Sequence, residues 1–325
     1  MDEADVIARL RRIATDPAAR GLNDDVALLD GLVLTHDSIA EGVHFLSSDP
    51  PASVGWKLVA VNLSDLAAKG AEPAGALLSM ALGSDPVWDS ELLTGVEHAC
   101  ESYGLPLIGG DTIALPPGAV RVLGLTAIGR AGERVPDRGG GRPNDRLWLV
   151  GTLGDAAAGL RQLLADRRSS GPLVDVYRRP VPLVAVGRTL AAHARAMMDV
   201  SDGLLLDARR MAEASACTLE IELEALPLSS AFVAEMGQDR PARLFAATGG
   251  DDYALLAALP AELEPATLCL PPGTRMTAVG TVRDGAPQVR LTSGGEPVEL
   301  PERLGFEHSP DHDRDGSGPP LADRS

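Results

Sequence analysis

The order of apolar and polar residues along this chain predicts both strands and helices. Two apolar runs flank Asp30-Gly31, a dipeptide typical of two-residue turns, so the chain around it is predicted to form a β-hairpin. Residues with helical apolar spacing run from Ser53, a candidate N-cap, to Gly70, a residue type that commonly ends helices. In the first half, the pattern predicts helices over 2–14, 53–70 and 87–103, and strands over 25–38, 105–111 and 119–130.

A polar segment rich in glycine and arginine, residues 133–145, separates the first half of the chain from the second. Beyond it, the pattern predicts strands over 146–151, 218–226, 252–259 and 276–282, helices over 154–168 and 180–196, and a strand that runs into a helix over 197–215. The last residues are polar and rich in glycine and proline, a composition typical of disorder. We therefore predict a mixed α/β (α+β) fold with domains over 1–137 and 138–308 and a disordered tail over 309–325.

The net charge of the chain disfavours some classes of binding partner. The chain carries 29 basic and 46 acidic residues, a net charge of −17. An excess of negative charge disfavours nucleic acid and anionic membranes as partners, because both are themselves negative. A phosphorylated substrate remains open, provided that cations screen the contact.

Cysteine usage and the N-terminus indicate the compartment. The three cysteines are widely spaced, with no CxxC pair, which favours reduced thiols over a disulfide framework or a zinc site. The first residues are charged and lack the apolar core of a secretory signal. No stretch approaches the roughly 20 uncharged apolar residues of a membrane span. We expect a cytoplasmic protein.

Carboxylates gather where apolar segments end or turn, which is where a rigid scaffold can present functional groups. The chain has no GxxxxGK[ST] loop, so a Walker-type phosphate site is excluded. Oxygen ligands without a His/Cys cluster suit Mg²⁺, and several such ions could hold a nucleotide. Each acid alone also has a plainer interpretation as a turn, cap or solvated residue. The acids concerned are Asp24, Asp25, Asp37, Glu41, Asp65, Asp111, Asp199, Asp202, Asp251 and Asp252.

Asp65 is the most informative acid, because it lies inside an apolar helix. At 100° per residue, Asn62, Asp65 and Lys69 form one stripe among Val, Leu and Ala. The plain interpretation is an Asp65–Lys69 pair on a polar face, worth a few tenths of a kcal/mol. Since apolar residues surround the stripe, we favour a covered Asp65 that binds a cation, with Lys69 incidental.

The motifs of the chain, taken together, resemble those of the thiamine-monophosphate kinase family. The resemblance implies the two-domain α/β fold of the aminoimidazole ribonucleotide synthetase superfamily, dimeric, with N-terminal strands of both subunits joined in a barrel. It implies direct phosphoryl transfer from ATP to thiamine monophosphate, assisted by several Mg²⁺ ions, with K⁺ a candidate further cation and with no covalent nucleophile on the protein. The motifs, in family order over residues 24–308, are DDVALL, LTHDSIAEGVHF, WKLVAVNLSDLAAKGAEP, LIGGDT, GTLGDAAAGL, DVSDGLLLD, TGGDDYALL, VGTV and LGFEH.

The resemblance also implies roles for individual residues, carried over motif by motif. The N-terminal domain would bind ATP and Mg²⁺ and form the dimer. The metal ligands would be Asp25, Thr35, His36, Asp37, Asp65, Asp111, Asp199 and Asp202. The ATP contacts would be Tyr103, Gly110, Asp111, Arg138 and Ser201, and the substrate-side residues His44, Asp251 and Phe306.

Three departures from the family pattern bear on these roles. Asn23 replaces a usual glycine, His36 a usual threonine, and Asp251 a usual glutamate, which reaches one methylene further. His36 would then offer only its backbone carbonyl. Two alternatives stay open: a non-catalytic binder of nucleotide or thiamine phosphate, and another ATP-dependent enzyme of the same superfamily.

Overall fold

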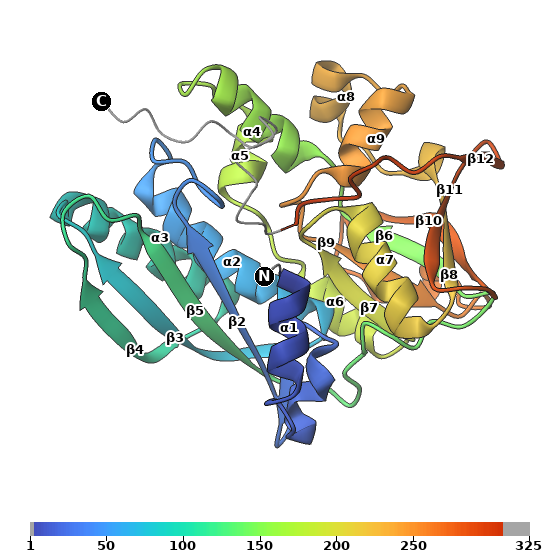
Figure 1. Cartoon of the computed structure of the whole chain (residues 1–325), viewed down its shortest axis with the longest axis horizontal. Helices are drawn as coiled ribbons and strands as arrows, with labels where there is room; N and C mark the ends of the chain where they lie inside the picture. The colour runs from blue at the N-terminus through green and yellow to red at the C-terminus, as the bar shows by residue number, and fades with distance from the viewer. Residues whose placement is uncertain (1–2, 308–325) are drawn as a thin grey trace. The chain divides into compact units, whose positions relative to one another are not determined.

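The computed structural model describes residues 3–307 (Figure 1). The fold is mixed α/β with two compact units, as predicted. The first comprises the residues up to Leu63 together with Pro73–Arg130, and the second comprises Ser64–Glu72 together with Ala131–Phe306. The predicted tail, 309–325, lies outside the described residues. Within the described part of the chain, no helix is both long enough and apolar enough to cross a membrane.

The first unit is built on a five-stranded sheet of order β1-β2-β5-β3-β4. Its predicted hairpin is confirmed, since Asp30 and Gly31 take φ values of 50° and 78° and join two antiparallel strands. The third strand was not predicted, because its run of Ala, Gly and Leu shows no strict alternation. The strands are β1 (Ala27–Leu29), β2 (Leu32–Ala40), β3 (Glu72–Leu82), β4 (Leu107–Ala114) and β5 (Val122–Arg130).

Two long helices lie behind this sheet in Figure 1. A Cβ at Gly95 would lie 2.0 Å from the carbonyl oxygen of Ala52, so glycine is what lets these helices approach so closely. The predicted N-cap at Ser53 was wrong, because the second helix already begins at Pro51, a residue type favoured in the first helical turn. The helices are α1 (Glu3–Arg11), the 3₁₀ turn η1 (Pro17–Leu22), α2 (Pro51–Ala68) and α3 (Pro86–Tyr103).

The second unit is built on a seven-stranded sheet of order β12-β11-β8-β10-β6-β9-β7. The strands of this sheet are β6 (Arg146–Val150), β7 (Ala196–Val200), β8 (Thr218–Glu222), β9 (Ala254–Leu259), β10 (Met276–Arg283), β11 (Gln288–Ser293) and β12 (Glu296–Val298). Its helices are α4 (Asp155–Ala165), α5 (Pro172–Arg178), α6 (Val184–Ala191), α7 (Leu204–Ser215), α8 (Ser230–Met236) and α9 (Arg240–Thr248), with 3₁₀ turns η2 (Leu223–Ala225) and η3 (Pro265–Thr267).

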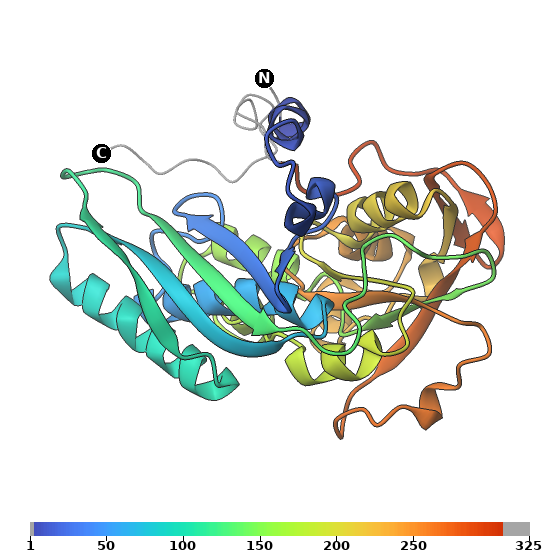
Figure 2. The same cartoon turned by 90° about the horizontal axis from the view of Figure 1, so that it is seen from below.

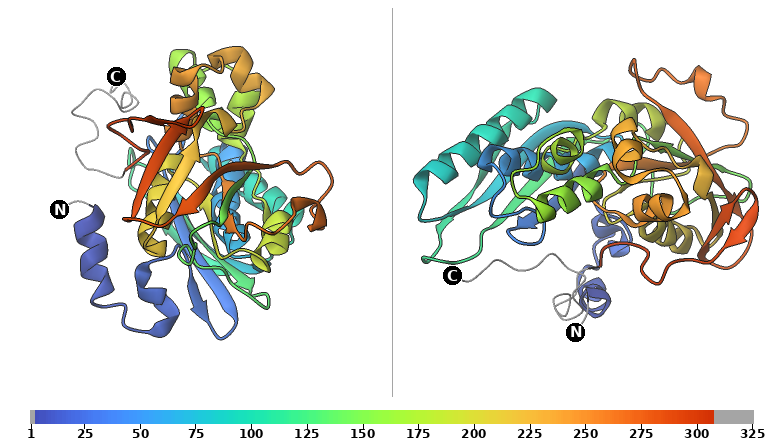
Figure 3. Two further views of the ribbon diagram at one scale, coloured as in Figure 1. Left: turned by 90° about the vertical axis from the view of Figure 1, so that its right-hand side faces the viewer. Right: turned by 90° about the horizontal axis from the view of Figure 1, so that it is seen from above.

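Both faces of this sheet are covered, so alternate residues of its strands enter different cores. In β7, Met198 and Val200 join the larger core with α7, whereas Met197 joins the core that contains α6 and the end of α2. Figure 2 shows α6 (yellow-green) and α7 (yellow) on opposite sides of the strands, and Figure 3 gives two further views. By the same alternation, Asp199 shares the face of Met197.

Candidate metal and substrate site

Strand β7 brings Asp199 towards the C-terminal part of α2. Ser64, fully buried on that helix, donates a hydrogen bond of 2.6 Å from its hydroxyl to Asp199 Oδ2. Asp199 is itself 4% exposed. A hydrogen bond to a carboxylate favours its ionised form and fixes its orientation, so this bond prepares Asp199 as a ligand.

Lys69 was expected to be incidental, and that expectation was wrong. Its side chain is fully buried, and its ammonium donates to the carbonyl oxygen of Met197 at 3.1 Å. Met197 precedes Asp199 by two residues on the same face of β7. Lys69 therefore ties the end of α2 to the strand that carries Asp199.

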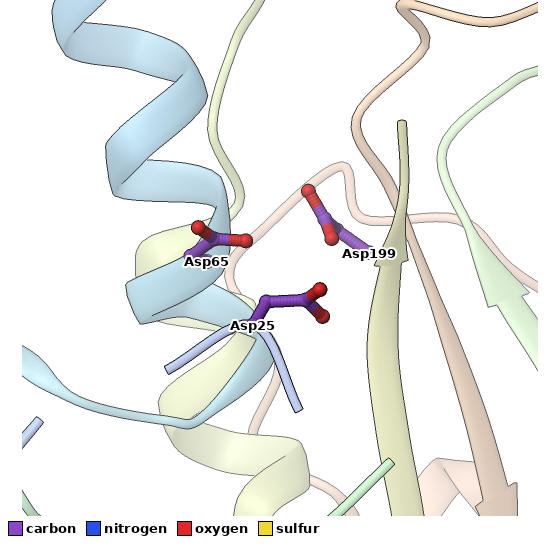
Figure 4. A group of neighbouring side chains, drawn as sticks. All are labelled: Asp25, Asp65 and Asp199. Carbon is purple, nitrogen blue, oxygen red and sulfur yellow. The ribbon is translucent and has the colours of Figure 1, made fainter. Parts of the chain in front are cut away.

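Three carboxylates lie close together (Figure 4). Asp25, Asp65 and Asp199 each offer an oxygen, and these atoms all lie within 4.8 Å of one another. Asp65 is 6% exposed, as the prediction of a covered carboxylate requires. Like charges this close repel, and the repulsion is strong where water is excluded. A divalent cation relieves it, and carboxylate oxygens are the ligands that Mg²⁺ prefers.

The turn that carries Asp25 forms without the glycine that the family places before it. Asn23, at that position, has an ordinary φ of −99°. The left-handed conformations lie just upstream, at Gly21 and its neighbours Arg20 and Leu22, with φ between 51° and 66°. The turn therefore does not require a glycine at position 23.

Strand β2 carries three further predicted ligands. The backbone N–H of Asp37 donates to Asn62 Oδ1 at 2.9 Å, which explains the amide in the predicted helix stripe. The hydroxyl of Thr35 donates to the carbonyl oxygen of Asp25 at 3.4 Å. The imidazole of His36 lies 2.8 Å from the Thr126 hydroxyl, and alternation places it on the face opposite Asp37. The imidazole of His36 therefore lies on the face of β2 away from Asp37.

The predicted ATP residues of the first unit lie at the end of α3 and on β4. Tyr103 makes an edge-on ring contact with Trp56 at 5.9 Å. Asp111 and Gly110 lie in β4, where all eight residues are exposed. A Cβ at Gly110 would lie 2.1 Å from Leu78 O of β3, so the packing of the sheet itself requires this glycine. Neither Asp37 nor Asp111 belongs to the three-carboxylate group found among the described residues.

Asp202 has a different environment from the other predicted metal ligands. Its Oδ2 accepts a hydrogen bond of 2.5 Å from Arg210, which also pairs with Asp207 at 2.9 Å. Burial raises the pKa of Asp207 to about 8, with the charge of Asp202 adding to the rise and Arg210 opposing it. Sequence reasoning missed Arg210, although its position three residues after Asp207 in a predicted helix was a usable signal.

The loop after β7 connects two predicted substrate-side residues. The N–H of Asp251 donates to Ser201 O at 2.7 Å, and the N–H of Phe306 donates to Asp202 O at 2.9 Å. Ser201 and Asp202 are consecutive, so Asp251 and Phe306 are anchored side by side on one backbone segment. The structure thus brings together these three predicted residues, Ser201, Asp251 and Phe306.

The two remaining predicted residues lie near turns. His44 Nδ1 accepts the backbone N–H of Ala40 at 3.1 Å, so the proton of the neutral ring resides on Nε2. Lys57, buried on α2, donates to the carbonyl oxygen of His44 at 2.9 Å and holds this turn. Arg138 follows Asp137, which bridges to Ala196 at the start of β7.

Comparison with known proteins gives one consistent result. Residues 23–131 match the family "AIR synthase related protein, N-terminal domain", and residues 142–289 match its C-terminal domain. A protein named thiamine-monophosphate kinase from Caulobacter vibrioides is 38% identical over 79% of this chain and 76% of its own length. One of the same name from Escherichia coli K12 is 34% identical, with 89% and 91% covered. A solved structure described as "AaThiL complexed with AMPPCP and TMP" matches with a TM-score of 0.82 at 32% identity, covering 95% of this chain and 97% of that one.

Proposed function

The chain belongs to the thiamine-monophosphate kinase family, and on that basis we propose that it phosphorylates thiamine monophosphate with ATP. The observation that carries the proposal is the likeness, over 95% of the chain, to a structure that holds AMPPCP and TMP. In the reaction, the bond between the γ-phosphorus and the bridging oxygen of ATP breaks. A new bond forms to an oxygen of the substrate phosphate, and ADP leaves with the electron pair. The products are ADP and thiamine diphosphate.

The three-carboxylate group of Asp25, Asp65 and Asp199 supports binding of Mg²⁺, because its donors are all hard oxygens within one short span. Bound Mg²⁺ supplies the positive charge that lets two polyanions approach each other. The residues of the chain fix the ligands in advance: Ser64 orients Asp199, and α2 holds Asp65 within an apolar surround. We assign further metal contacts to Thr35, Asp37, Asp111, Asp202 and the backbone of His36, and K⁺ remains a candidate cation.

Catalysis on this proposal is positioning and electrostatic stabilisation, since phosphoryl transfer needs little covalent chemistry from the protein. We assign ATP to Tyr103, Gly110, Asp111, Arg138 and Ser201, and thiamine monophosphate to His44, Asp251 and Phe306. Residues 1–137 then supply most of the nucleotide and metal contacts, and residues 138–308 supply much of the substrate side. Phe306 offers an apolar ring, and the carboxylate of Asp251 suits the cationic thiazolium.

We also propose a homodimer paired through β4. This strand is an edge of the five-stranded sheet, and its residues Leu107, Ile108 and Ile113 are each at least half exposed. An exposed apolar edge strand readily pairs with another chain. Pairing of this kind is how N-terminal strands of two subunits can join in one barrel. We place the protein in the cytoplasm, which the free thiols of Cys100, Cys217 and Cys269 support.

The decisive experiment is an assay for thiamine diphosphate after incubation of the full chain with ATP, Mg²⁺ and thiamine monophosphate. We expect product that depends on all three components. Binding of ATP and thiamine monophosphate without product would instead identify a non-catalytic binder. Product from another phosphate acceptor, with none from thiamine monophosphate, would identify a different enzyme of the superfamily.

A further inference from the structure

The segment 249–253, Gly-Gly-Asp-Asp-Tyr, is fixed along its backbone. The N–H of Asp251 donates to Ser201 O at 2.7 Å, and the N–H of Tyr253 donates to Val200 O at 2.9 Å. Both acceptors belong to the end of β7 and the residue that follows it. The segment therefore cannot shift relative to β7 without losing these bonds.

Asp252, between Asp251 and Tyr253, adds a third anchor on the other side. It is half-buried, and its carboxylate accepts the N–H of Gly154 at 2.7 Å and that of Ala156 at 3.4 Å. These N–H groups belong to the beginning of α4, where backbone donors lack partners within the helix. Asp252 thus joins the segment to the beginning of α4.

Those two neighbours have strained backbones. Asp251 and Tyr253 take φ values of 70° and 51°, in the left-handed region that residues other than glycine rarely adopt. For a bulky residue such as tyrosine this conformation is a genuine outlier. Strain of this kind persists only where surrounding contacts impose it, and it concentrates at ligand sites.

The two strained residues contact each other through their side chains. The hydroxyl of Tyr253 donates to Asp251 Oδ1 at 2.9 Å, and Tyr253 is only 7% exposed. We propose that Tyr253 is a positioning residue that fixes the Asp251 carboxylate to receive the cationic part of thiamine monophosphate. This inference rests on the proposed function and deepens it, by naming how one side of the substrate is recognised.

The short side chain of Asp251 gives such a positioning residue a clear purpose. A single methylene joins its carboxylate to the backbone, so the contact that it can make depends on accurate placement. A carboxylate already held in one orientation loses less conformational freedom when it binds a ligand. Phe306 donates its N–H to Asp202 O, next to Ser201, and its ring offers the apolar contact.

The test uses Tyr253→Phe in the full chain, which removes the hydroxyl and keeps the ring in place. We expect KM for thiamine monophosphate to rise about tenfold, with KM for ATP and kcat changed less than about twofold. A double-mutant cycle with Asp251→Asn isolates the contact, since Tyr253→Phe should add little once the carboxylate is gone. The control is Tyr177→Phe, which removes the hydroxyl of a different buried tyrosine, on α5. It should change neither KM for thiamine monophosphate nor KM for ATP.

The same cycle is measured on the dissociation constant of thiamine monophosphate by calorimetry, which needs no turnover. The positioning role would be overturned if Tyr253→Phe changed the dissociation constant equally with Asp251 present and with Asp251 replaced by asparagine. An equal rise in KM for thiamine monophosphate and KM for ATP would overturn it as well. Wild type that binds thiamine monophosphate without turnover refutes the kinase proposal, and the binding cycle then decides the role of Tyr253. Wild type that neither binds nor converts it overturns both proposals.

Discussion

Ser64 and Asp199 lie 135 residues apart in the sequence, and the serine hydroxyl donates to the aspartate carboxylate at 2.6 Å. Both are buried. The bond joins α2 to β7, the two elements that carry Asp65 and Asp199. It holds Asp199 in place relative to the end of α2 before any ligand arrives.

Replacing Ser64 with alanine should weaken metal binding without unfolding the protein. A hydrogen bond to a charged group is worth about 1.5–3 kcal/mol, so Ser64→Ala should raise the Mg²⁺ concentration for half-maximal activity at least about tenfold. Ser169→Ala removes a hydroxyl bonded to the carbonyl of Gln162 and should leave the Mg²⁺ dependence unchanged. Equal Mg²⁺ dependence of both variants would contradict the role of Ser64.

Asp65→Asn should abolish turnover while leaving the fold intact. The amide keeps the shape of the side chain but removes one of three charges that lie within 4.8 Å of one another. We expect kcat to fall at least about a thousandfold, since electrostatic stabilisation dominates phosphoryl transfer. Circular dichroism and the melting temperature check the fold, and Asp175→Asn, an exposed position on α5, is the matched control. Full activity of Asp65→Asn would refute the metal role.

The sequence predicted those features that depend on local chemistry. Asp30-Gly31 marked the hairpin, because the turn requires left-handed residues that this dipeptide tolerates. Asp65 stood out because an ionised group in an apolar helix needs a partner. Strand β3 was missed, since neither its alternation nor its residue types favour a strand.

Contacts between residues far apart in the chain could not be predicted from the sequence. Helical spacing placed Lys69 on the stripe of Asp65, but spacing does not say which distant segment covers that stripe. The covering segment is β7, and Lys69 consequently donates to Met197 rather than to solvent. Asp202 likewise matched the metal acids by motif, yet its carboxylate pairs with Arg210; helical spacing indicated only the contact of Arg210 with Asp207, not the one with Asp202.

Lys69 should contribute to stability. Lys69→Ala removes a fully buried side chain and its bond to Met197, so we expect the free energy of unfolding to fall by about 2–5 kcal/mol. Lys69→Met keeps most of the side-chain volume and should lower the free energy of unfolding by less. Arg290→Ala, at an exposed position of β11, should lie within about 0.5 kcal/mol of wild type. Urea denaturation measures all three, and equal values for Lys69→Ala and Arg290→Ala would exclude the structural role.

A charge on β4 should prevent the proposed pairing. Ile113 is 55% exposed, so Ile113→Lys should fold normally while placing a charge on the edge strand. We expect sedimentation to show a dimer for wild type and a monomer for the variant. Val181→Lys changes an exposed valine of the second unit and should stay dimeric. Dimers of both variants, or a monomeric wild type, would argue against pairing through β4.

Asp252 should make stability depend on pH. Burial raises its pKa well above the ordinary value of 3.8, and the charges of Asp155 and Asp251 add to this rise, whereas the N–H groups of Gly154 and Ala156 oppose it. At a pH between the ordinary pKa of the unfolded chain and the raised pKa of the folded protein, the folded state holds a proton that the unfolded state has released. The free energy of unfolding contributed by this group therefore falls as pH rises above about 4, until the raised pKa is passed.

Asp252→Asn removes this titration while keeping an oxygen acceptor for the N–H of Gly154. The difference in unfolding free energy between the variant and wild type should therefore shift in favour of the variant as pH rises above about 4. Denaturant titrations at several pH values measure this difference, with Asp175→Asn as an exposed control that should show no such trend. If the curves of wild type and Asp252→Asn ran parallel, the Asp252 carboxyl would titrate in the folded protein as it does in the unfolded chain, and a raised pKa for this group would be ruled out.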